Sequence, residues 1–248
     1  MTYYRLLLVS LMVFIFMGAV STISPSNSSA IAQNTVSNTS IVKDGDIPVD
    51  VYRDNSWARL PLPIRQELDE EGQRAFDIII NSESRYASGP RGPIAMWLYS
   101  PKMAEHIFPA STYLRYGTEK DQRLTELVIL ATAREVRSQY EWSAHEPLAL
   151  NAGLEPEVIA LLRDRAVLTN PIPGLGQQEM TIIRFVREAI NEERVSSDTF
   201  ARALELFGKK GVMDLTGLIA YYNFVNVTLK SFDIRLATGQ HRLLPELW

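Results

Sequence analysis

Apolar residues recur at helical spacing along most of the chain. Between Leu62 and about Asn81 the apolar positions fall three or four residues apart, which predicts an amphipathic helix. The stretch from Gly89 to Pro93 is rich in glycine and proline, so we expect a loop there. The same reasoning predicts helices at Ser100–Ile107, Asp121–Arg137, Glu155–Asp164, Gln177–Glu193 and Ser196–Phe207.

Two further segments complete this pattern. Ser138 can cap a helix that ends near Gly153 and contains Pro147, which should kink it or free a carbonyl. Val212 to Leu229 is apolar on nearly every face, which predicts a central, buried helix. Because no alternating strand pattern of any length is found, the chain is predicted to be all-α.

The N-terminus carries the pattern of an export signal. Arg5 precedes an apolar run from Leu6 to Val20, and Ala30–Ala32 matches a small-x-small cleavage site. We therefore predict a signal peptide at residues 1–32 and an exported protein, periplasmic or secreted. An uncleaved N-terminal membrane anchor is the alternative, although the apolar run is short for a membrane span.

The segment that follows differs in composition from the rest of the chain. Residues 33–56 are rich in serine, threonine and asparagine and poor in large apolar side chains, so they are predicted to be a disordered linker. The folded domain is predicted to span residues 57–248, beginning near Trp57.

Composition excludes several classes of function. The chain has 248 residues and a formal net charge of -4 without a basic stripe, so nucleic acid is not an expected partner. It has no cysteine, which excludes disulfides, thiolate catalysis and zinc–thiolate sites. The three histidines, His106, His145 and His241, are too dispersed for a paired metal motif, and no metal site is predicted. A site made of one histidine and carboxylates stays open as the alternative.

Glu126 is the first candidate for chemistry. It lies in the run Leu124–Leu130, where apolar residues occupy both neighbouring turns. A carboxylate there should be partly desolvated, which would raise its pKa and suit it to donate protons. A helix-end or ion-paired carboxylate is the alternative.

A second candidate group follows twelve residues later. Ser138, Glu141 and His145 fall on one edge of the predicted helix, with Glu141 and His145 four residues apart. Such a pair can fix the imidazole tautomer and hold its pKa near neutrality, which suits general acid–base catalysis. A surface pair that contributes a few tenths of a kcal/mol is the alternative.

These residues carry a resemblance to a known family. The matching stretches are Arg123–Leu130, Ala133–Glu135, Tyr140–Trp142 and His145–Ala149. They resemble the core helical hairpin of the carboxymuconolactone decarboxylase family, within the alkylhydroperoxidase D-like superfamily, and the likeness extends from about Trp57 to the C-terminus. In the related thiol peroxidases a Glu precedes a CxxC motif and a His, at the spacing shown here by Glu126, Ser138, Glu141 and His145.

The resemblance implies an alkylhydroperoxidase D-like helical bundle with a central helical hairpin. Ser138 and Glu141 stand where the two cysteines would be, so thiol peroxidase chemistry is excluded. The resemblance implies instead a cofactor-independent, decarboxylase-like lyase that acts on a small unsaturated lactone or carboxylic acid. The substrate's own conjugation would accept the electrons, so no metal or organic cofactor is implied.

The hypothesis assigns three catalytic roles. His145 is the acid or base, Glu141 is its orienting partner, and Glu126 is a second acid or polar anchor. The candidates for substrate binding are Ser138, Arg134, Tyr140 and Trp142. For Arg134 an ion pair with Glu135 or with a neighbouring helix is the alternative. Tyr140 and Trp142 are weaker candidates, because aromatic residues at helical spacing more often belong to the core.

Two other functions remain open at this point. The chain could be a non-catalytic protein that binds a small molecule in the same pocket, or a structural oligomer on the same fold. The resemblance also implies a homo-oligomer, either a trimer or a hexamer. In each catalytic or binding case the expected partner is a small molecule.

Overall fold

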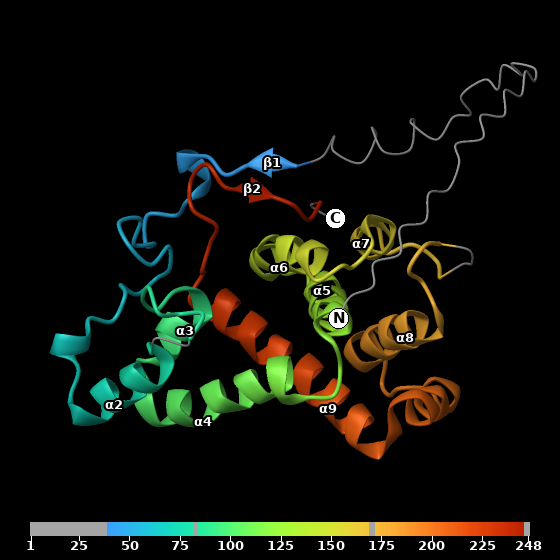
Figure 1. Cartoon of the computed structure of the whole chain (residues 1–248). Coiled ribbons are helices and arrows are strands. Elements are labelled where there is room, and N and C mark those ends of the chain that lie inside the picture. Colours follow the sequence, from blue (N-terminus) through green and yellow to red (C-terminus); the bar gives the residue numbers. More distant parts are fainter. Residues whose placement is uncertain (1–38, 82–83, 169–171, 246–248) are drawn as a thin grey trace, which may run out of the picture. The chain divides into compact units, whose positions relative to one another are not determined.

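The computed structural model describes residues 39–81, 84–168 and 172–245 (Figure 1). The predicted signal peptide at 1–32 and residues 33–38 of the predicted linker lie outside the described residues. Helices dominate the described part of the chain, which confirms the all-α prediction.

The described elements are α-helices with two short strands and three single helical turns of other types. Two single 3-10 turns, η1 and η2, and one π-helical turn, η3, accompany the α-helices. The bounds are β1 (Ser40–Ile41), η1 (Asp44–Asp46), η2 (Arg65–Glu67), α2 (Glu70–Ile79), α3 (Gly92–Trp97), α4 (Pro101–Thr112), η3 (Tyr113–Gly117), α5 (Gln122–Glu135), α6 (Gln139–Asn151), α7 (Pro156–Arg163), α8 (Gln177–Asn191), α9 (Ser197–Ser231) and β2 (His241–Arg242).

Side-chain caps define the hairpin formed by α5 and α6. Asp121 accepts a hydrogen bond from the Leu124 amide at 2.8 Å and so caps the start of α5. Ser138 caps α6 in the same way, accepting from the Glu141 amide. Between the helices Arg137 takes a left-handed conformation with φ of 56°, which reverses the chain within a few residues. The predicted helix boundaries hold here because the caps are local.

Three predicted boundaries are wrong. The helix expected from Leu62 begins only at Glu70, because Asp69 caps it by accepting from the Gly72 amide. α4 continues past Ile107 to Thr112, since Pro109 removes one hydrogen bond without ending the helix. The predicted loop at Gly89–Pro93 leads into the unpredicted helix α3, in which every residue is buried.

Helix α9 joins the two C-terminal helices that the pattern predicts. Gly208 has a φ of 64° and kinks the helix there. The two predicted helices therefore exist as separate parts, but they follow each other directly at this kink. The second part is not buried on nearly every face, because the side chains of Met213 and Val227 are more than half exposed. These residues share a stripe that no described element covers.

The segment from Ser40 to Ser56 is folded, so the predicted linker at 33–56 is wrong for its described part. β1 pairs antiparallel with β2, and Val42, Ile47 and Val51 form a small core. Composition concealed this arrangement because the segment contributes only a few apolar residues. They are buried against the partly buried Trp57, which follows soon after them, and against Leu236, which is distant in sequence.

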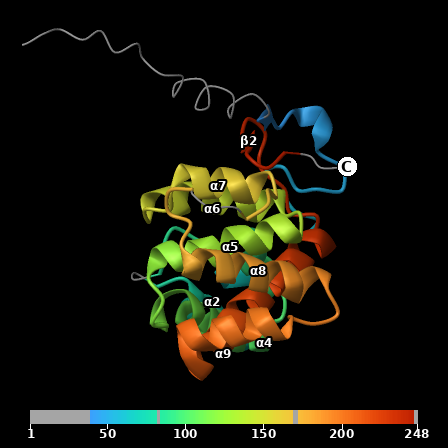
Figure 2. The same ribbon diagram turned by 90° about the vertical axis from the view of Figure 1, so that its right-hand side faces the viewer.

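Helix α5 lies at the centre of the larger core and packs against α6, α7, α8 and α9 (Figure 2). A second core joins α2, α3 and α4 to the C-terminal half of α9. Because α9 contributes to both, residues from distant parts of the sequence meet along its length. Among the described residues, no helix is both long enough and apolar enough to cross a bilayer.

Candidate functional site

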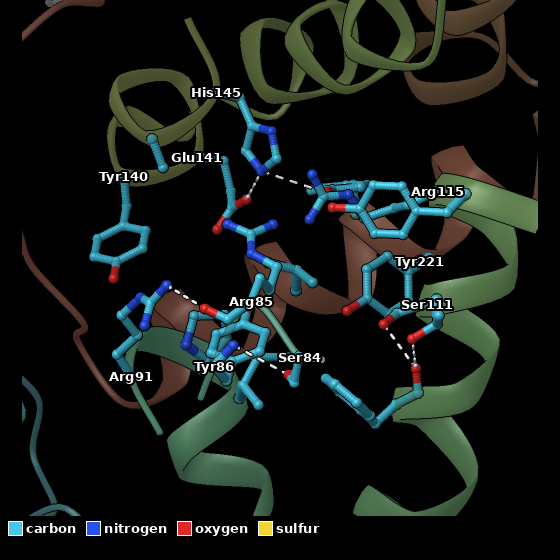
Figure 3. A pocket seen from close by; sticks show the side chains of 18 of the residues that line it. Ser84, Arg85, Tyr86, Arg91, Ser111, Arg115, Tyr140, Glu141, His145 and Tyr221 are labelled. Atoms are coloured by element: carbon cyan, nitrogen blue, oxygen red, sulfur yellow. Dashed lines mark hydrogen bonds and ion pairs between the residues drawn. The ribbon is translucent and has the colours of Figure 1, made fainter. Parts of the chain in front are cut away.

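A pocket of about 650 Å³ opens between α4, η3, α6, α9 and the segment before α3 (Figure 3). Glu141 and His145 reach it from α6, and Tyr221 and Tyr222 reach it from α9. The walls are thus supplied by elements from both cores, which fixes the positions of their side chains.

His145 is held between two carboxylates. Its Nδ1 lies 2.7 Å from Oε2 of Glu126, and its Nε2 lies 3.4 Å from Oε2 of Glu141. All three residues are at most 5% exposed. The partner closest to the ring is therefore Glu126 on α5, rather than the Glu141 that helical spacing predicts.

Arg115 completes the charge balance behind His145. Its Nη2 donates to Oε1 of Glu126 at 3.2 Å, and the residue is buried on the π-helical turn η3. The Gln122 side-chain amide donates to the Arg115 carbonyl at 2.6 Å, which fastens this turn to the start of α5. Single π-helical turns often occur at functional sites, and this one directs a cation into the interior.

Tyr222 lies on the opposite side of the His145 ring. The Tyr222 hydroxyl is 3.3 Å from His145 Nε2, and the two rings meet edge to face with centroids 5.3 Å apart. Burial raises the pKa of Tyr222 well above its usual value, so the phenol stays neutral. Its oxygen can therefore accept a hydrogen bond from Nε2 while its hydroxyl donates a second hydrogen bond to another group.

The buried charges shift one another's pKa values. Burial alone would raise the pKa of Glu126, but the hydrogen bonds and charges of His145 and Arg115 hold it below its usual value. This direction contradicts the sequence-based expectation of a raised pKa. Burial alone would lower the pKa of His145, yet Glu126 and Glu141 together raise it. The arrangement favours an imidazolium between two carboxylates.

Cations and aromatic rings dominate the outer part of the pocket. Arg85 and Arg91 each place a guanidinium over the Tyr86 ring, 5.3 and 4.9 Å from its centroid (Figure 3). Arg91 is further fixed by donating to the Arg85 carbonyl at 2.8 Å. The other aromatic lining residues are Phe108, Tyr116, Tyr140, Tyr221 and Tyr222.

The predicted substrate-binding residues are divided among three places. Tyr140 lines the pocket. Ser138 is buried as the cap of α6 and lines a second cavity instead. Arg134 donates to the Arg163 carbonyl, and Trp142 is fully buried in the larger core, where it donates to Glu146. Neither Arg134 nor Trp142 is among the residues that line the pocket.

Sequence reasoning missed Arg115, Tyr222 and the arginines at the mouth of the pocket. Arg115 precedes Glu126 by eleven residues and Tyr222 follows His145 by 77, so no helical spacing connects them. Tyr222 does carry a weak signal, because a tyrosine pair interrupts an apolar helix there. Buried tyrosines in such helices commonly direct their hydroxyl toward a polar partner.

The arrangement is suited to moving a proton at the wall of the pocket. His145 can donate from Nε2, and the carboxylates on both sides stabilise the charged form from which it donates. In residues 39–81, 84–168 and 172–245, no three His, Cys, Asp or Glu side chains are grouped to hold a metal ion. Proton transfer is the chemistry that His145 and its two carboxylates offer at the pocket wall.

Comparison with known proteins relates the chain to a protein family and to a solved structure. Residues 101–175, which include α4 to α7, match the model of the carboxymuconolactone decarboxylase family. The fold is similar to the crystal structure of an alkylhydroperoxidase AhpD core, an uncharacterized peroxidase-related protein from Ralstonia eutropha JMP134. That likeness has a TM-score of 0.56 and 17% identity, and covers 73% of this chain and 93% of that one. No curated protein matches the chain.

Proposed function

We propose, from the premise that this chain belongs to the carboxymuconolactone decarboxylase and alkylhydroperoxidase D-like superfamily, that it is a cofactor-independent lyase. Its substrate would be a small unsaturated lactone or carboxylic acid. The observation that carries the proposal is the position of His145 at the pocket wall, between the carboxylates of Glu126 and Glu141. The chain has no cysteine, so a thiol mechanism has no nucleophile.

The lining of the pocket supports an anionic, planar substrate. Arg85 and Arg91 supply positive charge at its outer part, and Arg115 does so beside the buried carboxylates. Guanidinium groups bind carboxylates through paired hydrogen bonds. The tyrosine rings around them offer flat apolar surfaces on which a conjugated ring can pack.

The proposed reaction breaks the bond between the substrate's carboxyl group and its α-carbon. Carbon dioxide leaves, and the electron pair of that bond passes into the conjugated system to form an extended enolate. His145 then transfers the proton of Nε2 to carbon, which forms the new C–H bond. The neutral imidazole recovers a proton from solvent through the open pocket, so the enzyme returns to its starting state.

The neighbouring groups have distinct roles in this scheme. Glu126 holds Nδ1 and fixes which edge of the ring faces the substrate, so it acts as a positioning residue. Glu141 stabilises the imidazolium from the pocket side, where it also contacts substrate. The Tyr222 hydroxyl, which lies beside Nε2, donates a hydrogen bond to the developing enolate oxygen and keeps its proton.

The test compares His145→Gln with wild type over a panel of unsaturated lactones and β-keto acids in deuterated water. Carbon dioxide release and deuterium incorporation at carbon are both measured. Wild type should turn over at least one compound, and His145→Gln should lose a factor of about 10² to 10⁴ in kcat. His106→Gln is the matched control, because His106 is exposed and does not line the pocket.

Two outcomes would overturn the proposal. Turnover that survives unchanged in folded His145→Gln would remove His145 from the mechanism. Saturable binding of these compounds without turnover of any of them would instead identify a non-catalytic binding protein, which the arginine and tyrosine lining would serve equally well.

A further inference from the structure

A second pocket of about 270 Å³ lies at the N-terminal end of α6. The last turns of α9 and the segment from Asp233 to Leu236 form its other walls, together with Val42 and Ile47. Tyr140 lines this pocket and the larger one, so its side chain stands between them.

The second pocket is strongly cationic. Its charged lining residues are Arg137, Lys230, Asp233, Arg235 and Arg242. Arg235 is paired with Asp233 at 3.0 Å, and Arg242 is paired with Asp46 at 2.8 Å. Arg137 and Lys230 form no ion pair with any described residue, so their charges are not compensated.

Asn226 supplies an independent sign that a ligand belongs there. It lines the second pocket and is only 5% exposed, yet its side-chain amide has no hydrogen-bond partner among the described residues. Its polar atoms are not among the fully enclosed side-chain atoms of the described residues, so a group bound in the cavity can reach them. The amide of Asn226 can donate two hydrogen bonds into the cavity.

The start of α6 adds backbone donors of the same kind. Ser138 accepts from the Glu141 amide, which leaves the Gln139 and Tyr140 amides in the first turn without an intrahelical acceptor. The positive end of the helix dipole also favours negative charge at this point. Donors and positive charge thus dominate the pocket, which excludes a cation as its ligand.

We propose that this second pocket binds a small oxyanion, either a phosphate or a carboxylate group. The Asn226 amide and the first-turn amides of α6 would donate hydrogen bonds to it, and Arg137 and Lys230 would neutralise its charge. The proposal concerns binding alone and stands independently of the lyase activity at the larger pocket.

The test titrates the full chain with inorganic phosphate and, separately, with acetate, by calorimetry at constant ionic strength. Constant ionic strength is required because screening weakens every exposed cation to a similar extent. Wild type should bind at least one of the two anions, with at least one anion bound per chain. Phosphate binding would identify a phosphate site, and acetate binding alone would identify a carboxylate site.

Variants assign the binding to the second pocket. The double variant Arg137→Gln, Lys230→Gln changes two exposed side chains and should weaken binding at least about tenfold. Asn226→Leu should weaken it as well. The matched control Lys102→Gln, Lys209→Gln removes the same charge from two exposed lysines elsewhere and should bind as wild type does.

The proposal is wrong if wild type binds neither anion. It is also wrong if the Arg137→Gln, Lys230→Gln variant keeps the affinity of its control while Arg91→Gln loses it. That result would assign anion binding to the larger pocket, which Arg91 lines.

Discussion

Helix α5 carries two ionic networks only three residues apart, and they differ in what surrounds them. In the first, Arg123 pairs with Glu155 and with Glu179, which fastens α5 to α7 and α8. In the second, Glu126 pairs with Arg115 and with His145. Both networks combine arginine with glutamate, so residue type alone does not distinguish them.

The two networks differ in whether all their donors are used within the protein and in whether they reach a cavity. Arg123 uses all three guanidinium nitrogens, donating to Glu155, Glu179 and the Gly174 carbonyl, at a partly exposed position. The second network is almost fully buried, but the Nε2 edge of His145 remains directed toward the pocket. A closed ionic network therefore stabilises the fold. A network in which one edge of an imidazole lies at a cavity, held there only by the longer contacts of Nε2 with Tyr222 and Glu141, provides a reactive group.

The largest expected effect comes from Glu126→Gln. This change leaves Arg115 and the charged His145 buried without their shared counter-charge, so the free energy of unfolding should fall by about 3–5 kcal/mol. Urea denaturation measures it. Glu157→Gln is the control, since Glu157 is exposed on α7 and should change the stability by less than about 0.5 kcal/mol. Equal stability in the two variants would show that the buried network is not charged.

Arg123→Met should have a smaller effect on stability and none on chemistry. Losing hydrogen bonds to two carboxylates at a position that is 21% exposed should cost about 2–3 kcal/mol. Turnover per folded molecule, measured below the melting temperature, should match wild type. The control is Arg202→Met, which breaks an exposed pair with Glu205 worth about 0–1 kcal/mol. A loss of kcat in folded Arg123→Met would contradict the purely structural role of the first network.

The smallest expected effect is a difference in pH dependence. The pKa of His145 is raised above 6.5 in the folded state, so its stabilising contribution is full below pH 6.5 and is lost as the pH rises through the folded-state pKa. The stability difference between wild type and His145→Gln should therefore shrink on the alkaline side. The arginine of the other network does not titrate in that range, so Arg123→Met should show no such trend.

At acid pH the stabilising contribution of Glu126 should be lost as the pH falls. The pKa of Glu126 is held below 4.5, so its contribution is present above pH 4.5 and is lost as the pH falls through the folded-state pKa. Thermal melts of wild type and Glu126→Gln from pH 3 to pH 6 would measure this loss. Curves that stay parallel over the whole range would contradict it.

The hairpin of α5 and α6, and the positions of Glu126, Glu141 and His145 on it, were predictable from the sequence because helix caps and helical spacing are local features. Asp121 and Ser138 define the helix starts, and the spacing of Glu141 and His145 follows from one helical turn. The same reasoning correctly divided α9 at Gly208, where the chain leaves the helical conformation.

What could not be predicted depends on tertiary contacts. The pKa of Glu126 was expected to rise, because its burial is visible in the sequence while the charges of Arg115 and His145 beside it are not. Arg134 and Trp142 looked suitable for binding, but α5 and α6 direct them toward Arg163 and the core. Only packing decides which face of a helix meets a cavity.

The central claim is that the second network keeps His145 protonated at the pocket wall. Nitrogen-15 NMR titration of the histidine rings measures this directly, with the His145 signal assigned by its loss in His145→Gln. We expect a His145 pKa above 6.5 in wild type and a lower value in Glu126→Gln, where the closest carboxylate is gone. A wild-type pKa below 6.5, unchanged by Glu126→Gln, would contradict the claim.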